Sequence, residues 1–321
     1  MSAKTSKITI VTPYRYSAWP LIGSAGGKMI CTYTVADQHN ATDTAVFLKT
    51  SDTNGQTWSE PSEIFTDKKG VKGATGMGYN SKGEMLLWHR NGKLEDVPGA
   101  HQLYKVEGTS TVLVSSPDFP LRSGHIGNIF QIPDKGLFAF YNTYGNTRSW
   151  GLLKSADDGL TWEQIPIEEN IPRAECPVEI ECACVEGDRI LVLGRKDAEE
   201  GIVAMFQIQS SDRGETWSKQ YTNITDSYGN SPSVIYDREN GRINLYYFVR
   251  FGGELKRRVV CLDDVWDAPM NWSDSEVLTA EPYGGWDTGN VKTTAVGDAH
   301  FCTYYAGTPT TTGVYGVIVT D

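Results

Sequence analysis

The sequence predicts an all-β fold, a six-bladed β-propeller built from four-stranded antiparallel blades. Two observations support this prediction. A short apolar strand, a turn containing glycine and a second apolar strand recur six times along the chain, and no useful length of sequence shows helical periodicity. Repeats of about 50 residues that hold several short strands are typical of propellers, whose radial repetition leaves only short sheet edges.

The turn glycine of each unit locates the repeat. The intervals between successive markers are 56, 53, 51, 54 and 56 residues, and the markers are Gly27, Gly83, Gly136, Gly187, Gly241 and Gly297. Units of such constant length fill the chain, so we expect one domain over residues 1–321. The sixth unit has room for only three strands. The N-terminal run KITIVTP is therefore expected to supply the fourth strand and close the ring.

Composition excludes some partners. The net charge of −11 argues against nucleic acid, because neutralising phosphates requires a basic surface. No run approaches the ~18 consecutive apolar residues of a membrane span, so no membrane insertion is expected. The N-terminus lacks the apolar segment of a secretory signal. We expect a cytoplasmic protein, or one exported by another route, for example on a phage.

Six cysteines are present and form no C-x-x-C pair. Buried, reduced thiols are the expected state of these residues, rather than a disulfide framework or a zinc site. No metal and no cofactor are predicted.

An acidic octapeptide is written three times in step with the repeat. It reads SADDGLTW at residues 155–162, SSDRGETW at 210–217 and, more loosely, SDTNGQTW at 51–58. A calcium loop would need several alternating oxygen ligands and a distal glutamate, which are missing. An Asp side chain that accepts backbone N–H groups and a glycine with positive φ make a self-sufficient turn. We expect a structural turn rather than an active site.

This S-x-D-x-G-x-T-W element resembles the Asp-box of the sialidase (neuraminidase) superfamily, and the resemblance covers essentially the whole chain. It implies a retaining exo-glycosidase that acts on an acidic sugar of the sialic acid type. In such a propeller, the loops that enter the first strand and leave the second strand of each blade meet around the axis. These loops are rich here in arginine, acids, histidine and tyrosine.

The resemblance implies that arginines bind the substrate carboxylate, a role for which a planar, permanently charged guanidinium is suited. Arg15, in YRYSAWP, is similar to the first of the family's three arginines. Arg195 is similar to the second, twenty residues after Glu175 in RAECPVE. Arg250 is the preferred third, with Arg257 and Arg258 as alternatives.

The resemblance also implies a tyrosine nucleophile that is activated by a glutamate, an exception among glycosidases. Tyr304 or Tyr305, in FCTYYAG, matches the nucleophile, and Glu175 matches its activating partner. Asp37, chosen over Asp43, would act as the general acid and base.

Other residues of the same loops extend the expected site and keep other functions open. His125 and Trp286 are expected to contact the substrate, an acidic glycan. His39, His89 and His125 also fall on ring-facing loops. A histidine and tyrosine pair could abstract the C5 proton of a uronate, which would make the protein a lyase. A hydrolase for another acidic saccharide and a carbohydrate-binding or adhesion propeller without turnover are further alternatives.

Overall fold

The structure, a computed structural model, describes residues 3–39, 41, 43–67, 73–90, 101–121, 124–197 and 203–321. Strands make up almost all of the regular structure in these ranges, which also hold the 3-10 turn η1 (Arg173–Glu175) and the short helix α1 (Leu262–Trp266). No helix in these ranges combines the length and the apolar composition of a membrane span. The all-β prediction is confirmed.

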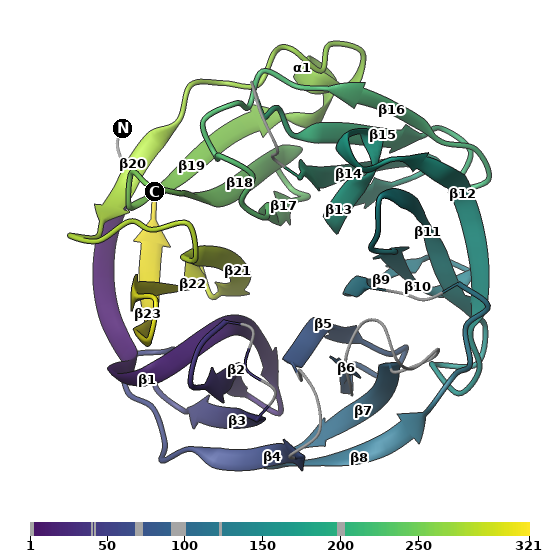
Figure 1. Cartoon of the computed structure of the whole chain (residues 1–321). Helices are drawn as coiled ribbons and strands as arrows, with labels where there is room; N and C mark the ends of the chain where they lie inside the picture. The colour runs from purple at the N-terminus through teal and green to yellow at the C-terminus, as the bar shows by residue number, and fades with distance from the viewer. Residues whose placement is uncertain are drawn as a thin grey trace.

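The strands form antiparallel sheets that follow one another along the chain and surround a central axis (Figure 1). Among the described residues, four sheets have four strands each. The first sheet holds β5 (Gly73–Tyr79), β6 (Met85–Arg90), β7 (His101–Glu107) and β8 (Ser110–Ser115), and the second holds β9 (His125–Ile132), β10 (Gly136–Asn142), β11 (Thr147–Ser155) and β12 (Glu163–Pro172). The third holds β13 (Pro177–Glu186), β14 (Arg189–Lys196), β15 (Phe206–Ser210) and β16 (Ser218–Tyr221), and the fourth holds β17 (Ser233–Asp237), β18 (Arg242–Val249), β19 (Glu254–Cys261) and β20 (Glu276–Ala280).

The fifth sheet joins the two ends of the chain and has seven strands in the described residues. Its strands are β21 (Gly289–Val296), β22 (Ala299–Thr308), β23 (Thr311–Thr320), β1 (Lys4–Ala25), β2 (Lys28–Ala36), β3 (Thr44–Ser51) and β4 (Ser62–Asp67). The long strand β1 serves twice, because its first half pairs with β23 and its second half with β2. The N-terminal strand therefore lies beside the C-terminal one, as expected, but the sheets are not six separate units.

Apolar side chains fill the spaces between neighbouring groups of strands. Six hydrophobic clusters appear among the described residues, and each combines side chains of two successive groups. One of them packs β21–β23 and the start of β1 against β2 and the end of β1, inside the seven-stranded sheet. The core is thus a ring of interfaces rather than one central mass.

The first strands of the sheets approach one another closely around the axis (Figure 1). A Cβ at Gly76 would lie 2.0 Å from the carbonyl oxygen of Gly127, and a Cβ at Gly127 would lie 2.4 Å from that of Ile180. Polar contacts join the same strands, since Glu181 of β13 accepts hydrogen bonds from Lys292 of β21 (2.8 Å) and from Asn128 of β9 (2.6 Å).

The three copies of the octapeptide are self-contained turns. In the second copy, Gly159 N donates to Ser155 Oγ (2.8 Å), Thr161 N donates to Asp157 Oδ1 (2.8 Å) and Trp162 Nε1 donates to Gly159 O (3.0 Å). The copy at 210–217 repeats these contacts, and the copy at 51–58 uses a threonine hydroxyl in place of the Asp carboxylate. These local bonds satisfy the motif, which supports the structural role predicted for it.

The cysteines are all free. Four are buried, Cys182 is partly buried, and Cys261 is exposed at the end of β19, where α1 begins. The expectation of reduced thiols is met, whereas that of burial fails at Cys261 and is met only in part at Cys182.

Candidate functional site

A cavity of about 350 Å³ lies where the first strands and the loops around them converge. Its wall combines cations, acids, histidines and aromatic rings from all five sheets and the loops beside them. The charged and titratable residues of the wall are Arg90, Arg195, Arg250, Lys292, Glu179, Asp197, His39, His125, Tyr144 and Tyr305. Trp19 and Trp286 add large aromatic surfaces. Among the described residues, no group of His, Cys, Asp or Glu is arranged to hold a metal ion.

Bulges in the first strands aim side chains into this cavity. The register shifts between Ala18 and Leu21 in β1, between Ala74 and Gly76 in β5, between Val178 and Glu181 in β13 and between Gly289 and Lys292 in β21. The extra residues, Trp19, Thr75, Glu179 and Asn290, all line the cavity. Three of them have positive φ: Trp19 (52°), Glu179 (49°) and Asn290 (48°). Such values are uncommon outside glycine, and bulges of this kind often reorient a side chain beside a functional site.

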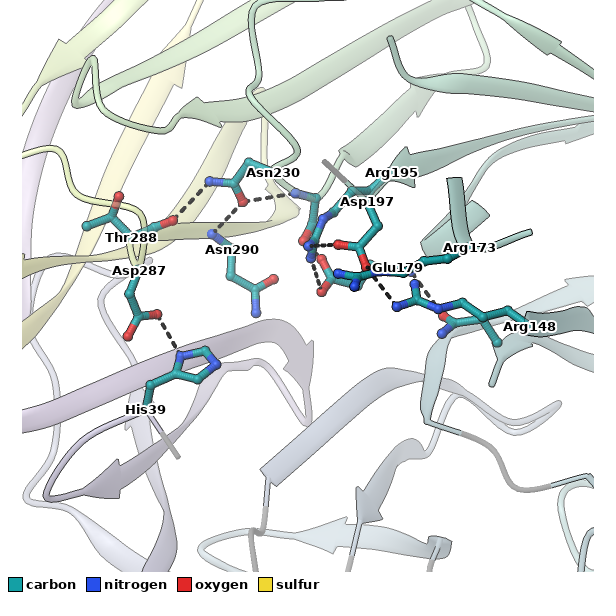
Figure 2. Close-up of polar contacts among 12 residues, drawn as sticks. His39, Arg148, Arg173, Glu179, Arg195, Asp197, Asn230, Asp287, Thr288 and Asn290 are labelled. Atoms are coloured by element: carbon teal, nitrogen blue, oxygen red, sulfur yellow. Dashed lines mark hydrogen bonds and ion pairs between the residues drawn. The ribbon is translucent and has the colours of Figure 1, made fainter. Parts of the chain in front are cut away.

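Arg195 lies at the centre of an ion-pair network on one side of the cavity (Figure 2). Its Nη1 is 2.5 Å from Glu179 Oε1 and its Nη2 is 2.8 Å from Asp197 Oδ1. Asp197 also pairs with Arg148 (2.8 Å) and Arg173 (3.0 Å). Burial alone would raise the pKa of Glu179, but Arg195 and His125 outweigh it and hold that pKa far below its ordinary value. These groups therefore stay charged and fixed.

Two other arginines of the cavity have no such partner in the part of the chain that the structure describes. No carboxylate of the described residues forms an ion pair with Arg90 or Arg250. Arg250 lies 5.5 Å from the ring of Trp286, and Arg90 Nη1 donates to the carbonyl oxygen of Gly124 (3.2 Å). Burial lowers the pKa of both guanidinium groups. Because a buried cation without a counter-charge is costly, this part of the cavity favours an anionic ligand.

Asp287 organises the opposite side of the cavity. Its Oδ1 accepts hydrogen bonds from Tyr305 Oη (2.6 Å), Tyr16 Oη (2.9 Å) and His39 Nδ1 (2.8 Å). Burial opposes ionisation, but these bonds outweigh it, so the pKa of Asp287 is below its ordinary value. Burial and the neighbouring carboxylate raise the pKa of Tyr305 well above that of a free phenol. The resting pair is a neutral phenol that donates to a carboxylate.

Six of the residues proposed from the sequence line this cavity: Arg195, Arg250, His39, His125, Trp286 and Tyr305. Tyr304 does not, because successive side chains of β22 point to opposite faces. Its ring is stacked on Phe248 between two sheets, and its hydroxyl donates to Glu281.

The structure does not bring Arg15, Asp37 and Glu175 to the cavity. Arg15 Nη2 and Asp37 Oδ1 are 2.7 Å apart in a solvent-exposed ion pair, with side chains 49% and 78% exposed. Glu175 is exposed in η1, where its backbone carbonyl accepts a hydrogen bond from Lys219. The acid beside Arg195 is Glu179, four residues later, because the bulge in β13 turns it inward.

The other residues considered from the sequence lie outside the cavity wall. Arg257 and Arg258 are buried in ion pairs, the first with Glu276 and Asp321 and the second with Asp226. His89 is stacked on Phe65 with ring centroids 4.0 Å apart, away from the cavity wall. Asp43 is exposed.

Several residues of the site were not identified from the sequence: Arg90, Glu179, Asp287, Lys292 and Tyr16. Arg90 and Asp287 do lie in the loop segments, WHRNG and GGWDTG, that were expected to face the axis. Glu179 and Lys292 lie within strands, where an alternating pattern does not reveal a bulge.

An all-β ring with repeated Asp-box turns and a charged central cavity defines a sialidase-like propeller. The BNR repeat-like domain family matches residues 27–300, so the chain belongs to this family. No curated protein matches the chain.

Solved structures with the same fold extend over the described chain at low identity. A protein of unknown function from Dyadobacter fermentans has a TM-score of 0.75 and 15% identity, with 98% of this chain and 99% of that chain covered. The NanB sialidase from Streptococcus pneumoniae has a TM-score of 0.68 and 14% identity (98% and 69% covered). Trypanosoma rangeli sialidase, as a covalent intermediate with 2,3-difluorosialic acid, has a TM-score of 0.68 and 12% identity (98% and 59% covered). At these identities the likeness shows the fold alone.

Proposed function

We propose that the protein is a sialidase-like retaining exo-glycosidase that acts on an acidic sugar of the sialic acid type. The observation that supports this most is that Arg250, a partly buried cation without a carboxylate partner among the described residues, lines the same cavity as Tyr305, whose hydroxyl is bonded to Asp287. One cavity thus combines an anion-binding group with a nucleophile and a proton acceptor. We also interpret the seven-stranded sheet as two blades that share β1, which gives the ring six blades.

In this proposal the substrate carboxylate binds between Arg250 and Arg195, with Arg90 as the third cation instead of Arg15. Guanidinium groups offer paired N–H donors that match the two oxygens of a carboxylate. Glu179 and Asp197 hold Arg195 in place, whereas Arg250 keeps its donors for the ligand. Arg90 and Arg250 would gain the counter-charge that the described residues do not give them.

Tyr305 is the proposed nucleophile, and Asp287 takes the activating role that was expected for Glu175. A carboxylate nucleophile would be repelled by the carboxylate of the substrate, whereas a neutral phenol is not. The 2.6 Å bond from Tyr305 Oη to Asp287 Oδ1 gives the phenol proton an acceptor during attack. The product sugar keeps its anomeric configuration, because two displacements occur at the same carbon.

Hydrolysis of a fluorogenic α-sialoside tests the proposal. We expect release of the fluorophore, and proton NMR of the first turnovers should show the α-anomer before mutarotation. Release of the β-anomer would contradict the Tyr305 mechanism. Absence of hydrolysis across about pH 4 to 8 would reject the glycosidase proposal itself.

A lyase acting on a uronate is the second candidate, and the contact between His39 and Asp287 beside Tyr305 favours it. A histidine held by a carboxylate can act as a base, and a cation beside it can neutralise a uronate. An increase in ultraviolet absorbance from an unsaturated product, without sialoside hydrolysis, would support this candidate. Retention on a glycan array with neither activity would instead indicate a carbohydrate-binding propeller.

A further inference from the structure

Cleavage of a glycosidic bond needs a proton donor for the departing oxygen, and the two carboxylates that line the cavity are unsuited to this role. Glu179 and Asp197 are both paired with Arg195. Burial acts against ionisation of each, but the arginines prevail, and both carboxyl groups have a pKa below the ordinary value. A carboxylate that stays ionised accepts hydrogen bonds and has no proton to transfer.

The cavity wall holds two histidines in different surroundings. Burial lowers the pKa of His125 to about 4. Glu179 raises this pKa, but the nearby cations Lys292, Arg90 and Arg195 lower it further. His125 is therefore neutral near pH 7. His39 has a side chain that is 34% exposed, and its Nδ1 lies 2.8 Å from Oδ1 of Asp287. A partly solvated imidazole beside a carboxylate is a suitable proton donor.

Contacts with Asp287 and with aromatic rings fix the orientation of His39. An ionised carboxylate can only accept, so Nδ1 of His39 carries the hydrogen of that contact. The ring of Trp19 packs against the imidazole at 5.1 Å and 80°, and that of Trp286 at 5.2 Å. Nε2 lies on the side of the ring away from Asp287 (Figure 2). This nitrogen is the one available to a ligand in the cavity.

We infer that His39 is the general acid and base of this site, in the role that a carboxylate such as Asp37 was expected to fill. The inference rests on the proposed function. It makes Asp287 a shared partner of the nucleophile and of the acid, because Tyr305 and His39 both donate to its Oδ1.

The steps balance. In the first, Tyr305 Oη attacks the anomeric carbon as the bond from that carbon to the leaving oxygen breaks. The phenol proton passes to Asp287, and protonated His39 gives its Nε2 proton to the leaving oxygen. In the second, water attacks the same carbon and loses a proton to Nε2. The bond to Tyr305 breaks, and the phenolate recovers its proton from Asp287.

Leaving-group dependence tests this assignment. Wild type and His39→Gln, whose amide can still donate to Asp287, are compared on a sialoside with a sugar leaving group and on an aryl sialoside. We expect His39→Gln to lose about 10²–10⁴-fold in kcat/KM on the first substrate. The loss on the aryl sialoside should be much smaller, because an aryl oxide departs without a proton. Azide should restore turnover of the aryl sialoside as sialyl azide, since it needs no base.

Asp37→Asn is the matched control, two residues away in an exposed ion pair with Arg15. It should keep wild-type values on both substrates, and unchanged melting temperatures would show that both variants fold. Equal losses of His39→Gln on the two substrates, or the leaving-group signature in Asp37→Asn instead, would overturn the inference. An inactive wild type would reject the proposed function, and with it the role of His39, which is a distinct result.

Discussion

The two sides of the cavity are built on different chemistry. On one side Arg195, Glu179 and Asp197 compensate one another's charges in ion pairs that extend to Arg148 and Arg173 (Figure 2). On the other side three donors converge on one oxygen of Asp287, and two of them are neutral tyrosines. The first arrangement keeps charges fixed, whereas the second lets protons move. Arg250, which lies 5.5 Å from the ring of Trp286, belongs to neither arrangement, since it forms no ion pair with a carboxylate of the described residues.

Replacing Tyr305 by Phe should have the largest effect. It removes the proposed nucleophile while keeping the ring, so kcat should fall by roughly 10⁴-fold or more, the scale found when an enzyme loses its nucleophile. Initial-rate measurements on an aryl sialoside would record it. Tyr304→Phe is the matched control and should keep kcat, since its hydroxyl contacts Glu281 outside the cavity. Equal activity of the two variants would contradict the assignment of Tyr305 as the nucleophile.

Arg195→Met should reduce stability in addition to weakening the binding of the substrate carboxylate. The substitution removes the cation that pairs with Glu179 and leaves Asp197 with only Arg148 and Arg173. Breaking a buried ion pair costs about 3–5 kcal/mol. Urea unfolding followed by tryptophan fluorescence should therefore show a lower free energy of unfolding. Unchanged stability would mean that the network around Arg195 does not fix this side.

Arg250→Met should weaken substrate binding without a loss of stability. The variant removes a partly buried cation that has no acid partner among the described residues, so the free energy of unfolding should stay equal or rise. Substrate binding should weaken by about 2–5 kcal/mol, seen as a higher KM, because a charge-assisted contact to the carboxylate is lost. Arg250→Lys, which keeps the charge but not the paired donors, should fall between Met and wild type. A large loss of stability in Arg250→Met would contradict this prediction and show that Arg250, like Arg195, also stabilises the fold.

The pH dependence of stability should show the smallest effect. The pKa values of Glu179 and Asp287 are lower in the fold than their ordinary values. Their contribution to stability is therefore fully present above the ordinary carboxyl pKa of about 4 and is lost as the pH falls through the lower folded value. Asp287→Asn should show a shallower fall in melting temperature between about pH 4 and 2 than wild type. The same slope in both proteins would argue against the ionised state of Asp287.

The sequence was sufficient to predict the all-β ring and those residues of the site that lie at the ends of strands or in the loops beside them. Arg195 lies at the end of β14, Arg250 directly follows β18 and Trp286 precedes β21, so the repeat alone located them. It misplaced the acid beside Arg195, because a bulge adds one residue to a strand without a local signal in the sequence. Glu179 and Trp19 reach the cavity in this way. The repeat also did not reveal that β1 would join two groups of strands into one sheet.

Contacts between loops that are far apart in the chain were a second feature that could not be predicted from the sequence. His39 and Asp287 are 248 residues apart and meet only because the ring closes. The residue type at each position was visible in the sequence, but their contact depends on the closure geometry. Asp37 was the more obvious acid by type, and its ion pair with Arg15 keeps it at the surface.

Covalent trapping tests the central claim, that the proton-transfer side of the cavity carries a tyrosine nucleophile opposite the arginines. The protein is incubated with 2,3-difluorosialic acid, digested, and mapped by mass spectrometry. We expect one added 3-fluorosialyl group on the peptide that contains Tyr305, fragment ions that place it on Tyr305 rather than Tyr304, and no label in Tyr305→Phe. A label on another residue, or full turnover of an aryl sialoside with no labelled tyrosine, would contradict the account.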